Sequence, residues 1–325
     1  MRDFIIYNDY TPKLEILQDK INGKEQPWRP KKMGNTKISD SYRRLGCEKY
    51  AENMKWCGWQ LEFDVNPETQ RKYLKSAKFC QKRLCIMCQW RKAIKVFHEV
   101  SRVMDVVERD YPDLQPIFLT LGQRNCGFGD LDGEIDSILK AFRRLNDHDL
   151  FRSQVQGWFR ALEITYNPKS NTWNPHIHAI LLVDKQYFRK TNKRYIDQPR
   201  WIRLWRTAMK LDYDPTARIQ KVKTTKGKYK GVAEVAKYTM KDGDLIAHDE
   251  ETTDRLVETL TKALYRRRLY AFGGVMKKIA KGLGAEKPDE GDLVHIDKDK
   301  IRADIAKVIE VYRWDFGLWD YIRRI

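Results

Sequence analysis

The chain has 325 residues, of which 63 are Lys or Arg and 45 are Asp or Glu, giving a net charge of +18 at pH 7. It is longer than the ~100–200 residues typical of one domain, so we expect a core with added pieces. No apolar run approaches the ~20 residues that span a bilayer, and the opening residues lack the apolar stretch of a signal peptide. These features argue against membrane and secreted proteins and predict a cytoplasmic protein with no membrane partner.

The chain begins with a polar segment, followed by one rich in cysteine. Residues 1–45 are polar, contain several prolines and are predicted to be partly irregular. Residues 46–92 contain Cys80, Cys85 and Cys88 in the pattern Cys-x4-Cys-x2-Cys. A Cys-x2-Cys turn brings two thiolates to one zinc ion, and a structural zinc takes four ligands.

The fourth cysteine of such a site must come from elsewhere in this segment. Cys57 is the best candidate, with Cys47 as the substitute. Thiols in a cytosolic protein point to metal binding more than to disulfides. A redox-active Cys-x-x-Cys, or cysteines that are merely buried, are the alternatives. The segment 46–92 is therefore predicted to bind a structural Zn²⁺.

Residues 93–248 show the alternating pattern of an α+β domain. Apolar spacing predicts a helix over 90–109, a strand over 117–121, a helix over 136–145, strands over 159–166 and 176–183, a helix over 199–209, a strand over 217–222 and a helix over 231–241. This order suits an antiparallel sheet with helices packed on one face.

The two neighbouring strands of this pattern carry candidate metal ligands. His176 and His178 are one residue apart, and residues i and i+2 of a strand point to the same face. Glu163 lies amid apolar neighbours on the preceding strand, where an unpaired carboxylate is costly to bury. Residues 167–175 are rich in turn formers and predict an antiparallel hairpin. The three side chains would suit Mn²⁺ or Mg²⁺ beside a phosphate substrate; half-buried histidines and a salt bridge from Glu163 to an Arg are the alternatives.

The predicted helix 231–241 brings three polar groups onto one stripe. At ~100° per residue, Glu234, Tyr238 and Lys241 fall within about 60° of one another. The simplest account is a solvated face with an i,i+4 pair. Beside a metal, a tyrosine can instead attack a phosphodiester and be held as a covalent intermediate, and a neighbouring carboxylate can activate water.

The stretch between the histidines and this helix points to nucleic acid. Residues 184–230 are rich in Lys and Arg, interleaved with aromatic residues. Basic side chains neutralise phosphates, and aromatic rings stack on unpaired bases. The predicted DNA-binding residues are Arg203, Arg206, Lys221, Lys223 and Lys237.

Residues 249–325 are predicted to form a helical, basic C-terminal region. Leu256, Leu260 and Leu264 recur at a four-residue spacing, and three arginines follow at 266–268. Two readings stay open: a helix packed on the core with a solvated basic side, or a surface that contacts DNA. The aromatic segment 312–321 is expected to dock on the protein or to form a partner surface.

Three motifs together resemble a known family. They are IFLTL at 117–121, NPHIH at 174–178 and EVAKY at 234–238. They resemble the first motif strand, the metal motif and the nucleophile motif of the plasmid rolling-circle replication initiators (Rep) of Gram-positive bacteria, which are members of the HUH endonuclease superfamily. The resemblance covers about residues 57–284, and Asn174 stands where many relatives have His.

The resemblance implies an HUH/RRM-like sheet and a role for each motif residue. His176 and His178 would be metal ligands, with Glu163 as the third ligand. Tyr238 would be the nicking nucleophile that forms a 5′-phosphotyrosine link, and Glu234 would promote hydrolysis when replication terminates.

The same resemblance implies the partners and the reaction. The expected substrate is the plasmid double-strand origin, single-stranded or in a hairpin at the nick. The protein would be a site-specific single-strand endonuclease and strand transferase. Lys241 is predicted to stabilise the phenolate or the developing phosphate charge, with Lys237, less favourably placed on the helix, as the alternative. A host helicase and the replication machinery are expected partners, and a homodimer is considered as well.

Two other classes of function fit part of the pattern. One is an HUH transposase or relaxase, against which the Cys-x2-Cys motif and Glu234 argue. The other is a non-catalytic nucleic-acid-binding module. Such a module should carry stacking aromatic residues on its central strands, where this chain has His176, His178 and Glu163.

Overall fold

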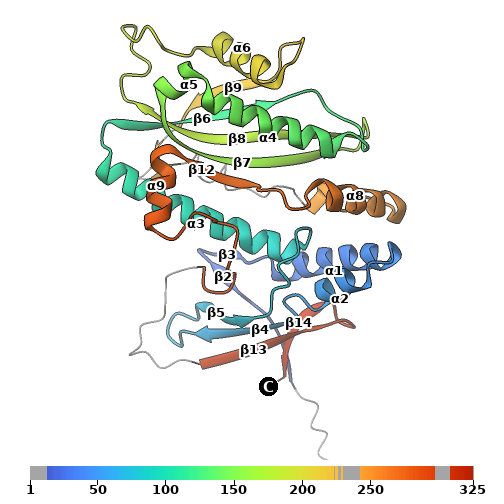
Figure 1. Cartoon of the computed structure of the whole chain (residues 1–325). Coiled ribbons are helices and arrows are strands. Elements are labelled where there is room, and N and C mark those ends of the chain that lie inside the picture. Colours follow the sequence, from blue (N-terminus) through green and yellow to red (C-terminus); the bar gives the residue numbers. More distant parts are fainter. Residues whose placement is uncertain (1–12, 223, 226–227, 230–241, 297–307, 325) are drawn as a thin grey trace, which may run out of the picture.

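The computed structural model describes residues 13–222, 224–225, 228–229, 242–296 and 308–324. Within these residues the chain forms two five-stranded antiparallel sheets. Helix α3 (Ile86–Asp110) lies between the two sheets in Figure 1. The predicted α+β class with antiparallel strands is confirmed.

The first sheet, which we call the central sheet, contains the predicted hairpin. Its strand order is β12 (Tyr270–Gly273), β7 (Val155–Asn167), β8 (Thr172–Asp184), β6 (Leu114–Gly122) and β9 (Ala217–Lys221). Along β8, Ile177, Ala179 and Leu181 are buried, whereas His176 and His178 are partly exposed. Because successive side chains of a strand point to opposite faces, this sheet has an apolar face and a face that carries the histidines.

Two helices pack against the central sheet. Helix α4 (Leu131–Asp147) contacts β8, and α6 (Gln198–Met209) contacts β9. Ile138 and Phe142 of α4 and Trp201 and Trp205 of α6 are buried. Helix α6 begins at Asp197, whose carboxylate accepts a hydrogen bond from the backbone N–H of Arg200, an N-cap that stabilises the first turn. The short helix α5 (Asp149–Gln154) leads into β7.

The second sheet, which we call the terminal sheet, joins strands from both ends of the chain. Its order is β1 (Leu14–Ile16), β14 (Asp320–Arg324), β13 (Val308–Asp315), β4 (Gln60–Val65) and β5 (Lys72–Ala77). Helices α1 (Trp28–Arg44) and α2 (Glu48–Lys55) pack on each other nearby, and a small hairpin is formed by β2 (Lys20–Ile21) and β3 (Lys24–Glu25).

The described part of the segment 1–45, residues 13–45, is more ordered than its composition predicts. It contains α1, a helix of 17 residues in which Ile38 and Tyr42 are buried. Pro27 is the N-cap residue of this helix and Pro30 lies in its first turn. A proline at the start of a helix removes no intrahelical hydrogen bond, so these prolines do not interrupt it.

The prediction of a helical C-terminal region holds for part of residues 249–325. Helices α8 (Glu250–Ala263) and α9 (Gly274–Gly282) lie there, but β12 joins the central sheet, and β13 and β14 join the terminal sheet. The aromatic segment is docked, with Tyr312, Trp314 and Tyr321 buried. Local apolar spacing could not show this, because β13 pairs with β4, which is far away in the sequence.

The remaining described elements lie on either side of the predicted helix 231–241. They are strands β10 (Thr224–Thr225) and β11 (Lys228–Tyr229) and the 3-10 turn η1 (Asp242–Asp244). The helix itself lies outside the described residues. Among the helices that the structure describes, none combines the length and the apolar character that crossing a bilayer requires.

Candidate active site and metal centres

The register of the central sheet brings Glu163, His176 and His178 onto one face. Glu163 on β7 is paired with His176 on β8, and His178 is paired with Thr120 on β6. Directly paired residues of antiparallel strands point to the same side. Both imidazole Nε2 atoms approach one carboxylate oxygen, since Oε2 of Glu163 lies 2.7 Å from Nε2 of His178 and 3.2 Å from Nε2 of His176. We call these three residues the triad.

The other ring nitrogens of the two histidines hold the rings in place. Nδ1 of His176 lies 3.0 Å from the backbone carbonyl of Asn174. A carbonyl only accepts, so Nδ1 donates to it, and Nε2 is the nitrogen that would offer its lone pair to a bound metal. Nδ1 of His178 lies 3.1 Å from Oγ1 of Thr120, and its ring stacks on Phe118 at 5.4 Å between centroids. Metal-binding histidines are held in this way by a hydrogen bond from the second nitrogen.

The carboxyl of Glu163 is held in its charged form. Burial alone raises its pKa, but the hydrogen bonds from His176 and His178 outweigh burial and lower the pKa well below its usual range. Glu163 is 9% exposed, and the two histidines are partly exposed. The sequence left open a salt bridge from Glu163 to an Arg; the structure instead sets the carboxylate against the two imidazoles.

The triad fits a divalent metal ion. Its ligand atoms lie within 4.8 Å of one another. Two imidazoles and one carboxylate form a donor set for a divalent cation with coordination positions left for a substrate. Both histidines reach solvent, so a phosphate could approach from that side.

Arg218 is a candidate site residue that sequence reasoning missed. It is paired with Thr120 across β6 and β9, so it points to the triad face, and it is exposed. The alternation in β9 placed Arg218 on the side opposite Ala217 and Ile219. The sequence could not say that β9 pairs with β6, and only that pairing places Arg218 beside Thr120 on the triad face.

Of the predicted DNA-binding residues that the structure describes, none forms a hydrogen bond or an ion pair with the triad. Lys221 pairs with Ile117, so it points to the opposite face of the central sheet, and its ammonium lies 4.4 Å from the ring centroid of Phe188. Arg203 is exposed on α6, and Arg206 on the same helix forms an ion pair of 3.0 Å with Asp214. The structure therefore does not gather these side chains around the triad.

Several other predicted site residues cannot be placed. Glu234, Lys237, Tyr238, Lys241 and Lys223 lie outside the described residues.

The described residues resume at residue 242, shortly after Tyr238 and Lys241. Asp244, six residues after Tyr238, is buried. Its carboxylate accepts a hydrogen bond of 3.1 Å from the backbone N–H of Tyr166 on β7. Tyr166 follows Glu163 by three residues, so Asp244 lies close to the strand that carries the carboxylate of the triad.

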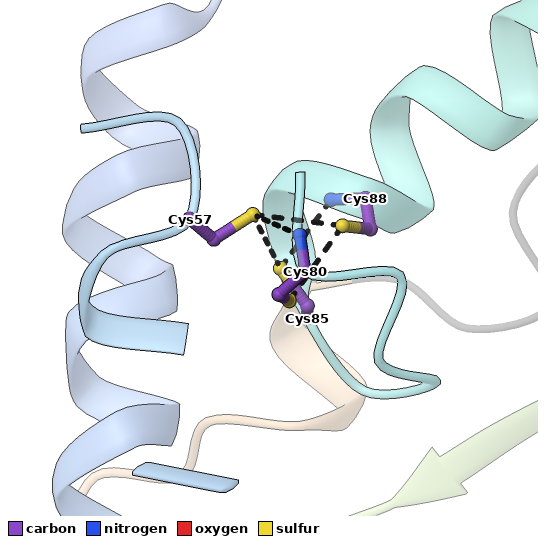
Figure 2. A group of neighbouring side chains, drawn as sticks. All are labelled: Cys57, Cys80, Cys85 and Cys88. Carbon is purple, nitrogen blue, oxygen red and sulfur yellow. Dashed lines mark hydrogen bonds between the residues drawn. The ribbon is translucent and has the colours of Figure 1, made fainter. Parts of the chain in front are cut away.

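The cysteines of the second predicted centre come together as a closed cluster. Figure 2 shows the side chains of Cys57, Cys80, Cys85 and Cys88 pointing toward one another. Sγ of Cys57 lies 3.4 Å from Sγ of Cys85 and 3.5 Å from Sγ of Cys88, and Sγ of Cys80 lies 3.8 Å from Sγ of Cys88. These separations are too long for disulfides, whose S–S bond is about 2.05 Å. Cys47, the substitute candidate, is exposed and lies outside the cluster.

The cluster fits a tetrahedral ion. Zinc–sulfur bonds are about 2.3 Å long, so four sulfurs around one zinc lie about 3.8 Å apart. Backbone N–H groups also point at the sulfurs: the N–H of Cys80 lies 3.3 Å from Sγ of Cys57, and that of Gln81 lies 3.3 Å from Sγ of Cys88. Such donors stabilise thiolates, the form that binds a metal.

A buried lysine ties helix α1 to this cluster. The ammonium of Lys32 donates to the backbone carbonyls of Lys55 and Cys57 at 2.6 and 2.7 Å. Burial lowers the pKa of Lys32 to about 8, and the nearby thiols of Cys57, Cys85 and Cys80 oppose this shift. Sequence reasoning missed Lys32, because nothing in the polar pattern of α1 marks a lysine that will be buried.

The family model and the curated relatives that match this chain are all described as replication proteins or rep proteins. The family model described as replication protein (Rep_1) matches residues 71–322. Protein rep of Bacillus amyloliquefaciens is 36% identical over 97% of this chain and 98% of its own length. Protein rep of Lactiplantibacillus plantarum is 32% identical over 94% and 98%, and a replication protein of Staphylococcus aureus is 35% identical over 66% and 94%. No solved structure matches the chain.

Proposed function

Because the chain belongs to the Rep_1 family of replication proteins, we propose that it initiates plasmid rolling-circle replication by nicking one strand of the double-strand origin. It would end replication by cleaving and rejoining the displaced strand. The observation that carries this proposal is the convergence of Glu163, His176 and His178 on one solvent-accessible site.

The triad would hold a divalent cation, Mn²⁺ or Mg²⁺, which suits a phosphate substrate. When bound, this ion supplies Lewis-acid polarisation of the scissile phosphate. Thr120 and the carbonyl of Asn174 keep the two imidazoles in the tautomer and orientation that a ligand needs. Arg218, on the same face, would bind a phosphate oxygen through its guanidinium.

Tyr238 is the proposed nucleophile. Its phenolic oxygen forms a bond to phosphorus while the bond from phosphorus to the 3′ oxygen breaks. The phenol loses its proton to solvent or a base, and the departing 3′ oxygen takes one up. The products are a 5′-phosphotyrosine and a 3′-hydroxyl that primes synthesis. One ester replaces another, so the step is reversible and rejoining needs no ATP.

Two neighbours of Tyr238 have proposed roles in the same reaction. Lys241 would stabilise the phenolate or the charge that develops on the phosphate. Glu234 would activate a water molecule at termination, so that the phosphotyrosine link is hydrolysed. The anchoring of Asp244 on Tyr166 supports this arrangement, because it fixes the chain beside β7 only six residues beyond Tyr238.

The four cysteines have a different proposed role. Cys57, Cys80, Cys85 and Cys88 would bind a structural Zn²⁺ with no position open for a substrate. The partners of the whole protein would be origin DNA, unpaired at the nick so that a protein nucleophile can reach phosphorus, and a host helicase with the replication machinery.

The experiment that tests the proposal is capture of the covalent intermediate. The protein is incubated with Mn²⁺ and a labelled single-stranded oligonucleotide of its own plasmid origin, then denatured and separated by size. We expect a labelled conjugate with the native chain and none with Tyr238→Phe. Tyr73→Phe, which changes a tyrosine on β5 of the terminal sheet, is the control and should form the conjugate. A conjugate that persists in Tyr238→Phe would show that another residue is the nucleophile.

A further inference from the structure

The apolar face of the central sheet borders a cavity that none of the roles above explains. It has a volume of about 680 Å³ and lies between α4, β7 and the segment 266–273 that leads into β12. The residues that matter for its chemistry are Phe142, Arg143, Trp158, Arg160, Arg268 and Lys277. Arg160 pairs with Ala179 of β8, whereas Glu163 pairs with His176. The cavity is therefore on the face of the sheet opposite the triad.

Arg160 is the most unusual residue of this cavity. It is 8% exposed, and its guanidinium donates hydrogen bonds to the backbone carbonyls of Arg268 and Leu269 at 3.3 to 3.4 Å. In the part of the chain that the structure describes, it forms no ion pair with a carboxylate. Burial, followed by repulsion from Arg268 and Arg143, lowers the pKa of Arg160 to about 10. A buried cation without a counter-ion is costly, so an anion that entered the cavity would be strongly favoured.

The other residues that line the cavity around Arg160 contribute two further positive charges and an aromatic surface. Arg143 and Arg268 are exposed and close enough to repel Arg160. The ring of Trp158 lies edge-on to Phe142 at 5.0 Å, and its N–H is fixed by Asn146 at 2.6 Å, so this wall is rigid.

The carboxylates at the cavity do not neutralise Arg160. Asp136 and Asp147 line the cavity as well. Asp136 forms ion pairs with Arg267 and, at 3.7 Å, with Lys140. Arg267 is also paired with Asp132. The charges of this group balance one another. Asp147 is exposed and, among the described residues, forms no ion pair with Arg160, so its single negative charge faces the three positive charges of Arg160, Arg143 and Arg268.

We propose that this cavity binds a backbone phosphate of DNA, with Arg160 at its base and Arg143 and Arg268 at its mouth. The inference rests on the proposal that the chain acts on DNA, but not on the nicking chemistry. Arg160 and Glu163 are three residues apart on β7, which is about 10 Å along a strand. The bound phosphate therefore belongs to DNA that passes the β12 edge of the sheet, outside the nucleotides at the triad.

The test measures binding of a fluorescein-labelled 30-base-pair origin duplex by anisotropy at several salt concentrations, in buffer to which no Mn²⁺ or Mg²⁺ is added. In Arg143→Gln/Arg268→Gln, we expect affinity to fall about tenfold near 0.1 M salt. The slope of log affinity against log salt should become shallower by about 1 for each phosphate that the variant no longer neutralises. Both side chains are exposed, and thermal melting checks that the variant is folded.

The matched control is Arg109→Gln/Arg152→Gln, which removes the same charge from exposed positions outside the cavity. Equal affinity and slope in the two double variants would overturn the proposal. A cavity variant that binds the duplex normally but loses affinity for ATP in calorimetry would also overturn it, since the phosphate would then belong to a free nucleotide. Because no Mn²⁺ or Mg²⁺ is added for the triad, the result is independent of whether Tyr238 is the nucleophile.

Discussion

The two clusters of metal-type ligands in this chain differ in how they are built. The cysteine cluster draws its ligands from separate segments, with Cys57 following α2, Cys80 following β5, and Cys85 and Cys88 at the start of α3. The triad draws its ligands from one hairpin of the central sheet. Three of the four cysteines are buried, whereas both histidines of the triad are partly exposed.

This difference predicts a role in folding for the cysteine cluster and a role in catalysis for the triad. Four protein ligands leave a metal no position for a substrate, whereas three ligands on an accessible face do. The cysteine cluster also joins segments that are distant in the sequence, and helix α1 is linked to it by the hydrogen bond from Lys32 to the carbonyl of Cys57. Damage to the first cluster should therefore change stability, and damage to the second should change activity while the fold is kept.

The largest expected effect is on stability, from Cys85→Ser. Cys85 is buried, and binding of a structural zinc is worth roughly 10–16 kcal/mol in small zinc domains. This exceeds the ~5–15 kcal/mol by which most domains are stable, so we expect cooperative thermal unfolding to be lost or shifted far down. Circular dichroism melting and zinc content by mass spectrometry measure this. Cys47→Ser is the control and should bind zinc and melt as the native chain does; the same behaviour in Cys85→Ser would remove the structural role.

The next effect is on activity, from His178→Ala. Loss of one ligand should lower the rate of nicking by about 10³-fold, since metal polarisation of a phosphate is worth several kcal/mol and each 1.36 kcal/mol is a factor of ten. The melting temperature should change little, because the ring is partly exposed. The measurement is the initial rate of nicking of supercoiled origin plasmid in Mn²⁺. His295→Ala, an exposed histidine paired with Asp292, serves as the reference; a rate within tenfold of it would contradict the metal role of the triad.

A smaller effect is expected from Thr120→Val, which removes the hydroxyl beside Nδ1 of His178 and keeps the side chain's shape. Residues that orient metal ligands typically contribute 10- to 100-fold to metal affinity or activity. We expect a loss in that range, read as a higher Mn²⁺ concentration for half-maximal nicking. Thr120→Ser keeps the hydroxyl and should recover most of the affinity. If the serine and valine variants need the same Mn²⁺ concentration for half-maximal nicking, the hydroxyl of Thr120 does not orient His178.

The sequence predicted those parts of the fold and the site that depend on local pattern. The resemblance to replication initiators is confirmed by the family match. The hairpin that presents Glu163 and the histidines follows from period-two alternation and a turn-rich loop, and the structure contains it. The triad also needed no long-range knowledge, because its residues lie on strands adjacent in the sequence.

What the sequence did not predict depends on pairing between distant segments. Residues 308–315 and 320–324 form strands β13 and β14 because β13 pairs with β4, which comes from a distant part of the sequence. Lys32 is buried because α1 packs where the carbonyls of Lys55 and Cys57 converge. Arg218 shares a face with the triad only because β9 pairs with β6. In each case a tertiary contact determines where the residue lies, and local periodicity in the sequence does not predict such contacts.

The smallest expected effect, and the one most specific to the triad face, comes from changing Arg218. A charge-assisted hydrogen bond from a guanidinium to a phosphate is worth ~1.5–3 kcal/mol, and exposure to solvent favours the lower end. Arg218→Gln should therefore lower kcat/KM for nicking about tenfold. Zinc content and melting temperature should remain those of the native chain.

The matched control for Arg218 is on the same strand. Lys221→Gln removes one charge from β9 on the face opposite the triad, and its kcat/KM should stay within about twofold of the native value, as expected for a rim charge. The comparison isolates the face of the sheet, because strand, exposure and charge change are shared. If both variants lose activity equally, only the net positive charge of this edge matters. The triad would then act without a guanidinium from β9, and the phosphate would be held without Arg218, by the proposed metal ion and by Lys241.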